Sequence, residues 1–588
     1  MKDIKIGSKY YYNVPSIRVP KAGLEEYATF VDEDDVVMEK PRKWVKPEAW
    51  PDIDKIPTPP NKEEIYLLFD TKFYPRDNSF NFISLTARGS YLVESGELNG
   101  DYQFNATSAP QSINNNLTFC ESLVGNRYRL YRITPQEESH LTYFSLSAQV
   151  TNDPDLPWGT EASFMPLVAI VVNAPYLKTV SQLATSCTQY AKLANLTEMT
   201  TAANLFPGGY ILEKVEMPGT TFEKAVTARS FLVNCYKLYD LDISDVTFSD
   251  KLTDCGYMFN NCQALTSLDV SVFHTQNVTN FTAMFSSCMS LKKIKGIEFM
   301  CVDSATNMSQ MFASVYNLEE LDLSYWTTGK LTNVSMFIAN CYKLRDFKMP
   351  AIFDTSDCTT FNSFMASCRC LEEISLRNMN VSGKATDLGY MFNGCTQLKK
   401  IERGAWHVEN VTDMTNMFNG CQSLQELDVS DWNDTSKVKN MSNMFRNLYR
   451  VTSLDISFLK TTQVPTNNLT ALVSGLSVAR NIKLPNDLKV APINLMASDK
   501  AVEKVVVPET VTSIMTSAFY NLRCCKAILF TNHTAVPTIS SVNDIVNATN
   551  PNIKIVIPDA LYNQWIAAPV WKTPVLKDKI VKQSEYTG

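Results

Sequence analysis

The stretch Met417-Phe-Asn-Gly-Cys-Gln-Ser-Leu-Gln-Glu-Leu-Asp-Val-Ser-Asp-Trp432 decides the fold, because variants of it recur along the chain. Each variant has a pair of apolar residues, mostly Met-Phe, three and four residues before a slot that is usually cysteine. The slots lie 26 or 27 residues apart and are occupied by Cys235, Cys262, Cys288, Val315, Cys341, Cys368, Cys395, Cys421 and Leu448. Such a period predicts a solenoid, in which each unit buries its apolar face by stacking on its neighbours.

Each unit divides into two parts. The Met/Phe pair and the slot have helical spacing, whereas Leu427-Asp-Val-Ser430 alternates as a half-buried strand does. We therefore expect a short helix and then a strand in every unit, with the strands forming one continuous parallel sheet flanked by the helices. Asn or Asp four residues before the pair is expected to start each helix, because these residues accept bonds from free amide groups. These positions are Asp254, Asn280, Asn307, Asn333, Asp387, Asp413 and Asn440.

A further apolar position, eleven residues after the slot, is expected to close each coil from the far side. It is occupied by Phe273, Phe299, Trp326, Trp406 and Trp432, among others. Gly475 and Ala518-Phe-Tyr-Asn-Leu522 suggest degenerate repeats that continue toward a C-terminal cap.

The whole pattern, with Asn410-Val-Thr-Asp-Met414 ahead of the quoted stretch, resembles the BspA-type leucine-rich repeat of bacterial surface adhesins and some phage fibres. The resemblance covers about residues 206–485. Ile555-Val-Ile-Pro-Asp-Ala-Leu-Tyr-Asn-Gln-Trp565, followed by Trp571, is similar to the closing segment of that family. The pattern departs at Lys295-Gly296 and at Lys348-Met-Pro350, where the Leu-Asp-Val-Ser element is lost.

The residues ahead of the repeats predict three smaller modules. Ile4 to Val19 alternates around a Gly turn, which predicts a pair of short strands. The prolines and tryptophans between Pro41 and Pro60 favour a stiff extended tether. Runs such as Ile65–Phe69 and Tyr128–Ile133, separated by turn residues, predict a small β-sandwich, and Phe164–Val172 predicts a buried strand.

The start resembles the N-terminal attachment segment of many phage structural proteins, and the order of tether, sandwich and repeats looks like certain phage tail-fibre proteins. The expected fold is therefore mixed α+β, with an N-terminal β anchor and a β-sandwich followed by a BspA-like leucine-rich-repeat solenoid. The expected boundaries are 1–36 for the virion-attachment segment, 37–60 for the tether, 61–160 for the sandwich, 161–205 for a transition and N-terminal cap, 206–485 for the solenoid, and 486–588 for degenerate repeats and a C-terminal cap.

Bulk composition narrows the classes of function. The 588 residues are 45% hydrophobic and 20% charged, which is typical of globular domains. The net charge of -7 argues against a nucleic-acid partner, whose phosphates require a surplus of basic residues. No apolar stretch approaches the roughly 20 residues of a membrane span. Charged and polar residues interrupt the first ten residues throughout, so we expect no export by the general route.

The cysteines are expected to be reduced and structural. Their total of 15 is odd, and seven of them occupy the repeat slot, where a small buried apolar side chain is the usual occupant. The four histidines are widely scattered, so no zinc site is expected. We expect no cofactor and nominate no catalytic, cofactor-binding or metal-binding residue.

Two sets of exposed residues recur with the repeat. A carboxylate recurs once in several coils, at Asp242, Asp269, Asp322, Asp428 and Asp455. A glycosidase needs only one pair of carboxylates in a groove, so this periodicity favours a solvated or structural ladder. The second set comprises candidate contact residues, none singled out as a site: Tyr236, Tyr239, Tyr257, Tyr316, Tyr325, Tyr342 and Tyr390.

These observations predict a non-enzymatic phage virion structural protein, a surface fibre or appendage on tail or head. It would be made in the host cytoplasm, reside on the virion surface, and present its solenoid to a host cell-surface protein or glycan. Its other expected partners are further virion proteins, reached through residues 1–36, and copies of itself in a homo-oligomer. Two alternatives remain open, a bacterial surface adhesin with leucine-rich repeats and a virion depolymerase.

Overall fold

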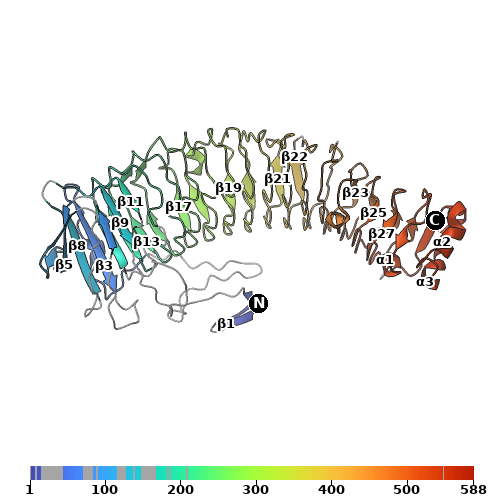
Figure 1. Cartoon of the computed structure of the whole chain (residues 1–588), viewed down its shortest axis with the longest axis horizontal. Helices are drawn as coiled ribbons and strands as arrows, with labels where there is room; N and C mark the ends of the chain where they lie inside the picture. Colours follow the sequence, from blue (N-terminus) through green and yellow to red (C-terminus); the bar gives the residue numbers. More distant parts are fainter. Residues whose placement is uncertain are drawn as a thin grey trace.

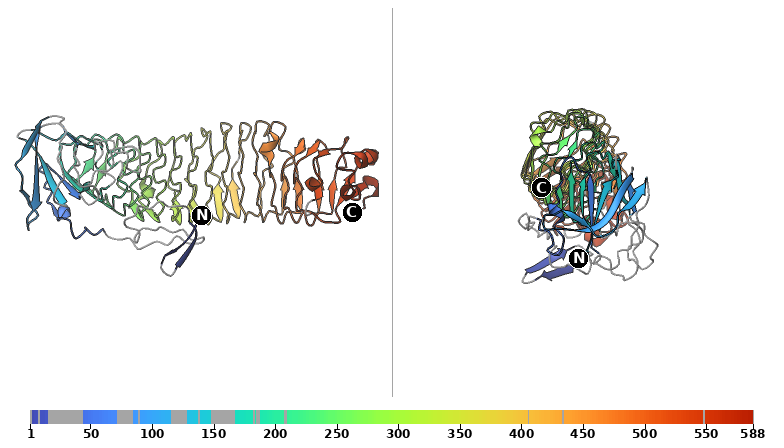
Figure 2. Two further views of the ribbon diagram at one scale, coloured as in Figure 1. Left: turned by 60° about the horizontal axis from the view of Figure 1, so that its bottom comes forward. Right: turned by 90° about the vertical axis from the view of Figure 1, so that its left-hand side faces the viewer.

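The computed structural model describes residues 2–6, 9–14, 44–70, 84–87, 90–114, 128–136, 139–147, 167–181, 183, 187–206, 209–404, 406–432, 434–546 and 549–587. The chain forms an arched rod, a β-solenoid of about 15 turns with little helix (Figure 1). Figure 2 shows the coils stacked along the rod axis. A single cluster of buried apolar side chains extends from Ile65 to Ile580, so one core runs through the rod.

The N-terminal end of the rod is a nine-stranded sheet in the order β15-β13-β12-β10-β3-β8-β5-β6, with β7 paired to β5. Its strands are β3 (Glu64–Asp70), β5 (Ser90–Leu98), β6 (Phe104–Ala106), β7 (Gln111–Asn114), β8 (Tyr128–Pro135), β10 (Leu167–Asn173), β12 (Tyr190–Ala194), β13 (Lys214–Glu216) and β15 (Asp240–Asp242). Three strands of the same part of the chain form a separate sheet in the order β11-β9-β4. They are β4 (Ser84–Ala87), β9 (Tyr143–Ser147) and β11 (Thr179–Ser181).

Strand β3 joins this end to the solenoid. It pairs antiparallel with β8 on one side and with β10 on the other, and β10 then pairs parallel with β12. The antiparallel strands therefore extend the first parallel sheet of the solenoid, and the separate β-sandwich expected over 61–160 is not confirmed. Strands β3 and β10 are buried along their whole length, as expected for Phe164–Val172 and for apolar runs that are covered on both faces.

The expected tether is wrong for residues 44–60, which we call the strap. Trp44 and Trp50 are only 8% and 5% exposed, because the strap covers the outer face of β3, β10 and β12. The ring of Trp44 stacks on that of Tyr190, with 4.9 Å between centroids. Proline favours extended chain, but the apolar area of two tryptophans outweighs that preference once a sheet face is available.

Side chains of the sheet hold the strap by hydrogen bonds. Asn173 Nδ2 donates to the carbonyl of Pro59 at 3.0 Å, and Asn195 Nδ2 donates to that of Thr58 at 2.9 Å. A single 3-10 turn, η1 (Ile53–Lys55), turns the chain, and Ile53 is fully buried. Residues 37–43, also assigned to the tether, lie outside the described residues.

The pair of strands expected near the N-terminus is confirmed as β1 (Lys2–Ile6) and β2 (Lys9–Val14), which pair antiparallel. Among the described strands, these two pair only with each other. The rest of the expected attachment segment, residues 15–36, lies outside the described residues.

The helix expected in each repeat is wrong, and a left-handed turn replaces it. In the second coil, Tyr257 has φ 59° and Asn261 has φ 63°, and the same two positions are left-handed in the neighbouring coils. Alternate amides bond to the next coil, as Tyr257 N–H does to the Thr282 carbonyl at 2.7 Å. The physical reason is width, since an α-helix is about 10 Å across and stacked strands are only about 4.8 Å apart.

The Asn and Asp positions expected at helix starts form the longest ladder of the solenoid, which we call the turn-side ladder. Parallel bridges join Thr227, Asp254, Asn280, Asn307, Asn333, Thr360, Asp387, Asp413 and Asn440 without a break. Within each coil the side chain accepts the amide two residues on, as Asp254 Oδ1 does from Gly256 at 2.8 Å. The expected capping chemistry is therefore present, but in a turn and not at a helix start.

The continuous sheet expected on the opposite side, the strand face, is also wrong. In the first coils β12, β13 and β15 pair in a row, but between Ser267 and Lys483 the strands pair in twos: β17 (Ser267–Asp269) with β18 (Lys293–Lys295), β19 (Glu320–Asp322) with β20 (Asp346–Lys348), β21 (Glu373–Leu376) with β22 (Lys400–Arg403), and β23 (Ser453–Asp455) with β24 (Asn481–Lys483). A further pair, β14 (Thr221–Phe222) with β16 (Thr247–Phe248), comes later in its coils than the strand face does. The segment Leu427–Ser430, predicted to be a strand, belongs to none.

The interior contains the expected column of aromatic rings. The rings of Phe285 and Phe312 stack with centroids 5.5 Å apart, and those of Phe392 and Phe418 do the same. The far-side position is buried at Trp326 but 71% exposed at Phe299. There the left-handed Gly296 leads into η3 (Ile297–Phe299), so that Met300 points inward instead. A Cβ on Gly296 would lie 2.6 Å from the Ser271 amide, which explains the departure from the repeat pattern at this point.

The cysteine slots form a column of hydrogen-bond donors. Cys288 Sγ donates to the Phe259 carbonyl at 3.1 Å, and Cys341 and Cys421 make the same contact with the preceding coil. Burial raises the pKa of Cys288 to about 12, so the thiol keeps its proton. The described cysteines are free. The slot accommodates a thiol donor but does not require one, because Val315 and Leu448 fill it in two coils.

The degenerate repeats continue to the C-terminal end with shorter coils. Their strands are β25 (Val490–Ala491), β26 (Lys504–Val506), β27 (Ser513–Ile514), β28 (Ala527–Leu529), β29 (Thr538–Ile539), β30 (Lys554–Ile557) and β31 (Ile580–Lys582). The helical turns there are η4 (Thr466–Leu469), α1 (Asn543–Val546), η5 (Asp559–Leu561), α2 (Tyr562–Ala567), α3 (Pro574–Lys577) and η6 (Gln583–Glu585). Trp565 and Trp571 are buried under this end of the rod. Within the described ranges, no helix has the length and apolar character needed to cross a membrane.

Candidate binding surface

The recurring carboxylates of the strand face are structural in their contacts. Asp269 Oδ1 accepts the Ser271 amide at 3.0 Å and hydroxyl at 2.6 Å, and its Oδ2 lies 2.7 Å from Lys295 Nζ on the paired strand. The same ion pair recurs between Asp322 and Lys348 and between Asp455 and Lys483. In each case the acid is on the first strand of a pair and the lysine on the second.

These contacts keep the carboxylates ionised. The Lys295 hydrogen bond, followed by those from Ser271, lowers the pKa of Asp269 to about 2, and Lys348 does the same for Asp322. The general acid of a glycosidase needs a raised pKa. The interpretation of this series as a structural ladder fits these contacts better than a catalytic pair.

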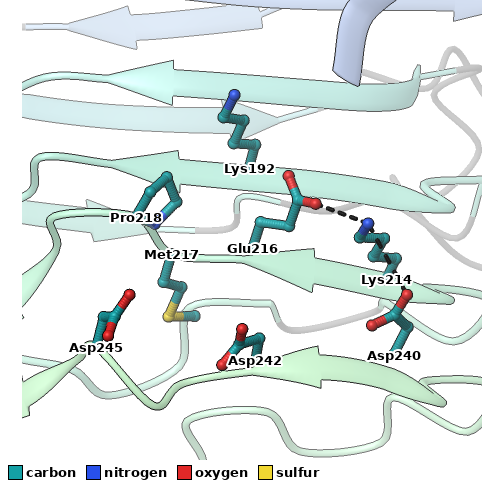
Figure 3. Close-up of a pocket in the computed structure, with 8 residues that line it drawn as sticks. All are labelled: Lys192, Lys214, Glu216, Met217, Pro218, Asp240, Asp242 and Asp245. Atoms are coloured by element: carbon teal, nitrogen blue, oxygen red, sulfur yellow. Dashed lines mark ion pairs between the residues drawn. The ribbon is translucent and has the colours of Figure 1, made fainter. Parts of the chain in front are cut away.

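A shallow hollow of about 380 Å³ lies where the strap meets the first coils (Figure 3). Lys214 Nζ lies there 2.7 Å from a Glu216 carboxylate oxygen and 3.8 Å from Asp240. Tyr190 donates its hydroxyl to Glu216 at 2.8 Å, and burial with the nearby Glu216 charge raises the pKa of that tyrosine. The charged groups therefore satisfy one another. Contact with the strap comes from Lys214, whose Nζ lies 5.6 Å from the centroid of a Trp44 ring, and from Lys192, which donates to the Ile56 carbonyl at 3.1 Å.

Four tyrosines, two of them exposed and two half-buried, form two stacked pairs along the rod, at the residue that follows the slot. The rings of Tyr316 and Tyr342 are 4.6 Å apart and nearly parallel, and the Arg369 guanidinium lies 4.5 Å from the Tyr342 ring. Tyr210 and Tyr236 form a second pair at 5.5 Å. We call these residues the tyrosine column. Aromatic rings with an adjacent arginine are enriched in protein interfaces and offer a large, rigid contact area.

The remaining tyrosines suggested by the sequence do not join this column. Tyr239 is packed against the core under the strap, and Tyr257 lies below the Arg229 guanidinium. Tyr325 is 72% exposed, but it follows the strand of its coil, away from the slot. Sequence reasoning missed Tyr210, although its spacing from Tyr236 was a usable signal.

Two family models match the chain. Residues 253–374 and 359–480 match the family described as Mycoplasma protein of unknown function, DUF285. Residues 470–542 match the BspA type leucine rich repeat region. Residues 470–542 are therefore similar to BspA-type leucine-rich repeats. Neither match spans half of the sequence, and none of the curated proteins matches it.

Solved structures of leucine-rich repeat proteins are similar over most of the chain. One of them, from Bacteroides ovatus, is 14% identical to this chain and has a TM-score of 0.34, and the match covers 76% of this chain and 96% of that protein. A leucine rich cell surface protein from Faecalibacterium prausnitzii is 14% identical, covers 74% and 93%, and scores 0.25. The pneumococcal vaccine antigen PcpA is 11% identical, covers 75% and 93%, and scores 0.27. At such scores these likenesses carry no argument about function.

Proposed function

We propose that this chain is a surface-displayed, non-enzymatic binding protein that attaches to a host cell-surface protein or glycan through its solenoid. The observation that carries the proposal is the tyrosine column, with Tyr210 and Tyr236 at 42% and 38% exposure on a rigid scaffold. A rigid aromatic surface loses little conformational entropy when it binds, which favours attachment. The BspA-type repeats support the same role, because the sequence pattern resembles that of surface adhesins.

The test is binding of the fluorescently labelled chain to candidate host cells. Replacing Tyr316 and Tyr342 by Ser should reduce binding at least tenfold, since interface aromatics contribute the most on truncation. Tyr325→Ser is the matched control, because it removes an exposed tyrosine outside the column. Equal binding by the double variant and the control would contradict the proposal.

We further propose that the chain is displayed on a phage particle and is held there by residues 1–36. The support is the resemblance of its start to phage attachment segments, together with the β1–β2 hairpin, whose edge strands are suited to adding strands from a partner or a second copy. A homo-oligomer would multiply weak contacts with the host.

Particles made with a gene lacking residues 1–36 should lose the chain, while the truncated protein stays soluble and folded. Normal incorporation would overturn the anchor assignment. Antibody labelling in electron micrographs distinguishes display on a phage particle from display on a bacterial cell. Label on bacterial cell surfaces and none on particles would favour the alternative, a bacterial surface adhesin with BspA-type repeats.

A further inference from the structure

The strand face opens into a hollow at one point, between β22 and the unpaired segment 425–431. The hollow has a volume of about 740 Å³, within the range of small-ligand sites. Its floor includes Ile401 and Leu427, which are only partly buried. The same position on paired strands is closed, with Leu321 at 3% and Leu454 at 2% exposure.

The two coils do not pair across the hollow. Strand β22 pairs with β21 on one side, whereas segment 425–431 of the next coil belongs to no strand. Glu402 and Asp428 occupy the same position of these two coils. The break in pairing leaves the apolar side chains between the coils partly uncovered.

An aromatic side chain is part of the lining. Trp406 is 4% exposed, and the Arg403 guanidinium lies 5.6 Å from the centroid of its ring. The indole Nε1 of Trp406 is buried and has no hydrogen-bond partner, as is also true of Trp432, so the polar contacts with a ligand come from the exposed groups of the rim.

The rim supplies donors and acceptors on opposite walls. Arg403 donates to Asp431 Oδ2 at 2.7 Å and to the Asp428 carbonyl at 2.8 Å, so it bridges the two coils. Glu426 lines the same wall as Asp428 and is exposed. The lining carboxylates outnumber the lysines and arginine by one, from Glu373, Glu426, Asp428 and Asp431 against Lys399, Lys400 and Arg403.

We propose that this hollow binds a neutral saccharide unit. A sugar ring presents an apolar C–H face, which suits the Ile401 and Leu427 floor, and a rim of hydroxyls that both donate and accept. The slight excess of carboxylates disfavours an acidic sugar. This inference deepens the proposed function, on which it rests, by naming the ligand class and the place where it binds.

The experiment measures binding of the full-length chain to lactose, maltose, cellobiose and N,N′-diacetylchitobiose by saturation-transfer NMR and calorimetry, with sialyllactose as the acidic comparison. At least one neutral sugar should bind. Glu426→Ala should weaken it about tenfold or more, whereas Glu320→Ala, at the same coil position on a paired strand, should leave it unchanged. Asp428→Lys places a longer side chain of opposite charge in the lining and should abolish binding, while an unchanged melting temperature shows that the variant is folded.

The inference would be overturned if no neutral sugar bound, or if the chain preferred sialyllactose. It would also be overturned if Glu426→Ala and Asp428→Lys bound the sugar as tightly as the natural chain does. Cell binding by the same proteins separates this outcome from failure of the proposed function. If the chain binds cells but no sugar, the proposed function stands and the assignment of the hollow as a sugar site falls. If it binds sugar in the hollow but no cells, the sugar site stands and the proposed function falls.

Discussion

The two sides of the coil differ in continuity. On the turn-side ladder, bridges run without a break from Thr227 to Asn440. On the strand face the ladder is interrupted: between Ser267 and Lys483 the strands pair only in twos, whereas β12, β13 and β15 at one end and β26, β28, β30 and β31 at the other pair in rows. Every rung of the turn-side ladder accepts the amide two residues on, even where two acids meet at Asp387 and Asp413. On the strand face the comparable bond, such as that of Asp269 with the Ser271 amide, is present only in some coils. A backbone bond that repeats in every coil therefore keeps neighbouring coils in register.

The apolar interior packs against both sides of the coil. Truncating one of its side chains should therefore have the largest effect on the free energy of unfolding. Phe285 is fully buried between Phe259 and Phe312. Replacing it with Ala should cost about 3–5 kcal/mol, the usual loss for a buried aromatic side chain. Thermal unfolding followed by circular dichroism would measure this, and an unchanged melting curve would exclude a continuous core.

The second-largest effect on stability is expected at a buried carboxyl group. Asp499 occupies the slot that is cysteine in most earlier coils. Its Oδ1 accepts the Leu476 amide at 2.7 Å, but its Oδ2 has no partner, and desolvation raises the pKa of this carboxyl well above its usual range. The protonated form is therefore favoured in the folded state. As pH rises above the unfolded pKa of about 4, the unfolded chain releases its proton first and folding loses stability.

Asp499→Asn keeps the acceptor and removes the charge, so it should gain about 1–3 kcal/mol at pH 7, the range for relieving a buried unsatisfied polar group. The difference from the natural chain should shrink toward pH 4. Melting temperatures of both proteins between pH 4 and pH 7 would check this, and a gain that does not depend on pH would contradict it.

Removing one rung from the turn-side ladder should cost less. Asn280 Oδ1 accepts the Thr282 amide at 3.1 Å, and its Nδ2 donates to Asp254 at 2.9 Å. Asn280→Ala leaves that amide without its partner and should cost about 1–2 kcal/mol. Hydrogen exchange of the Thr282 amide should speed up, and unchanged protection would show that water replaces the side chain.

The smallest effect is expected on the strand face. Asp322 lies 2.8 Å from Lys348, but both side chains are largely exposed. Asp322→Asn should therefore cost less than about 1 kcal/mol, as for other exposed ion pairs. The cost should fall further in high salt. A loss larger than that of Asn280→Ala would reverse the ranking of the two sides.

The sequence predicted the features that every coil repeats, such as a buried side chain or a bonded one. It did not predict features that depend on contacts with another part of the chain. The Met/Phe pairs, the slots and the Asn/Asp positions were recognisable because each coil imposes the same burial or bond. Helical spacing at Met258 and Cys262 was misleading, because a left-handed turn of the same length buries the same residues. The sequence showed the tyrosine column only in part: Tyr236, Tyr316 and Tyr342 were named, but neither Tyr210 nor the stacking of the rings was predicted.

The sequence by itself determined that this chain is a solenoid with a coil of 26 or 27 residues, because the period is written in residues that must be buried. Only the tertiary structure decided that the strap folds onto β3, since Trp44 and Trp50 find an apolar face there that no local pattern reveals. It also decided where the strand face opens, because segment 427–430 carries the same alternating pattern as its neighbours and yet pairs with neither adjoining coil.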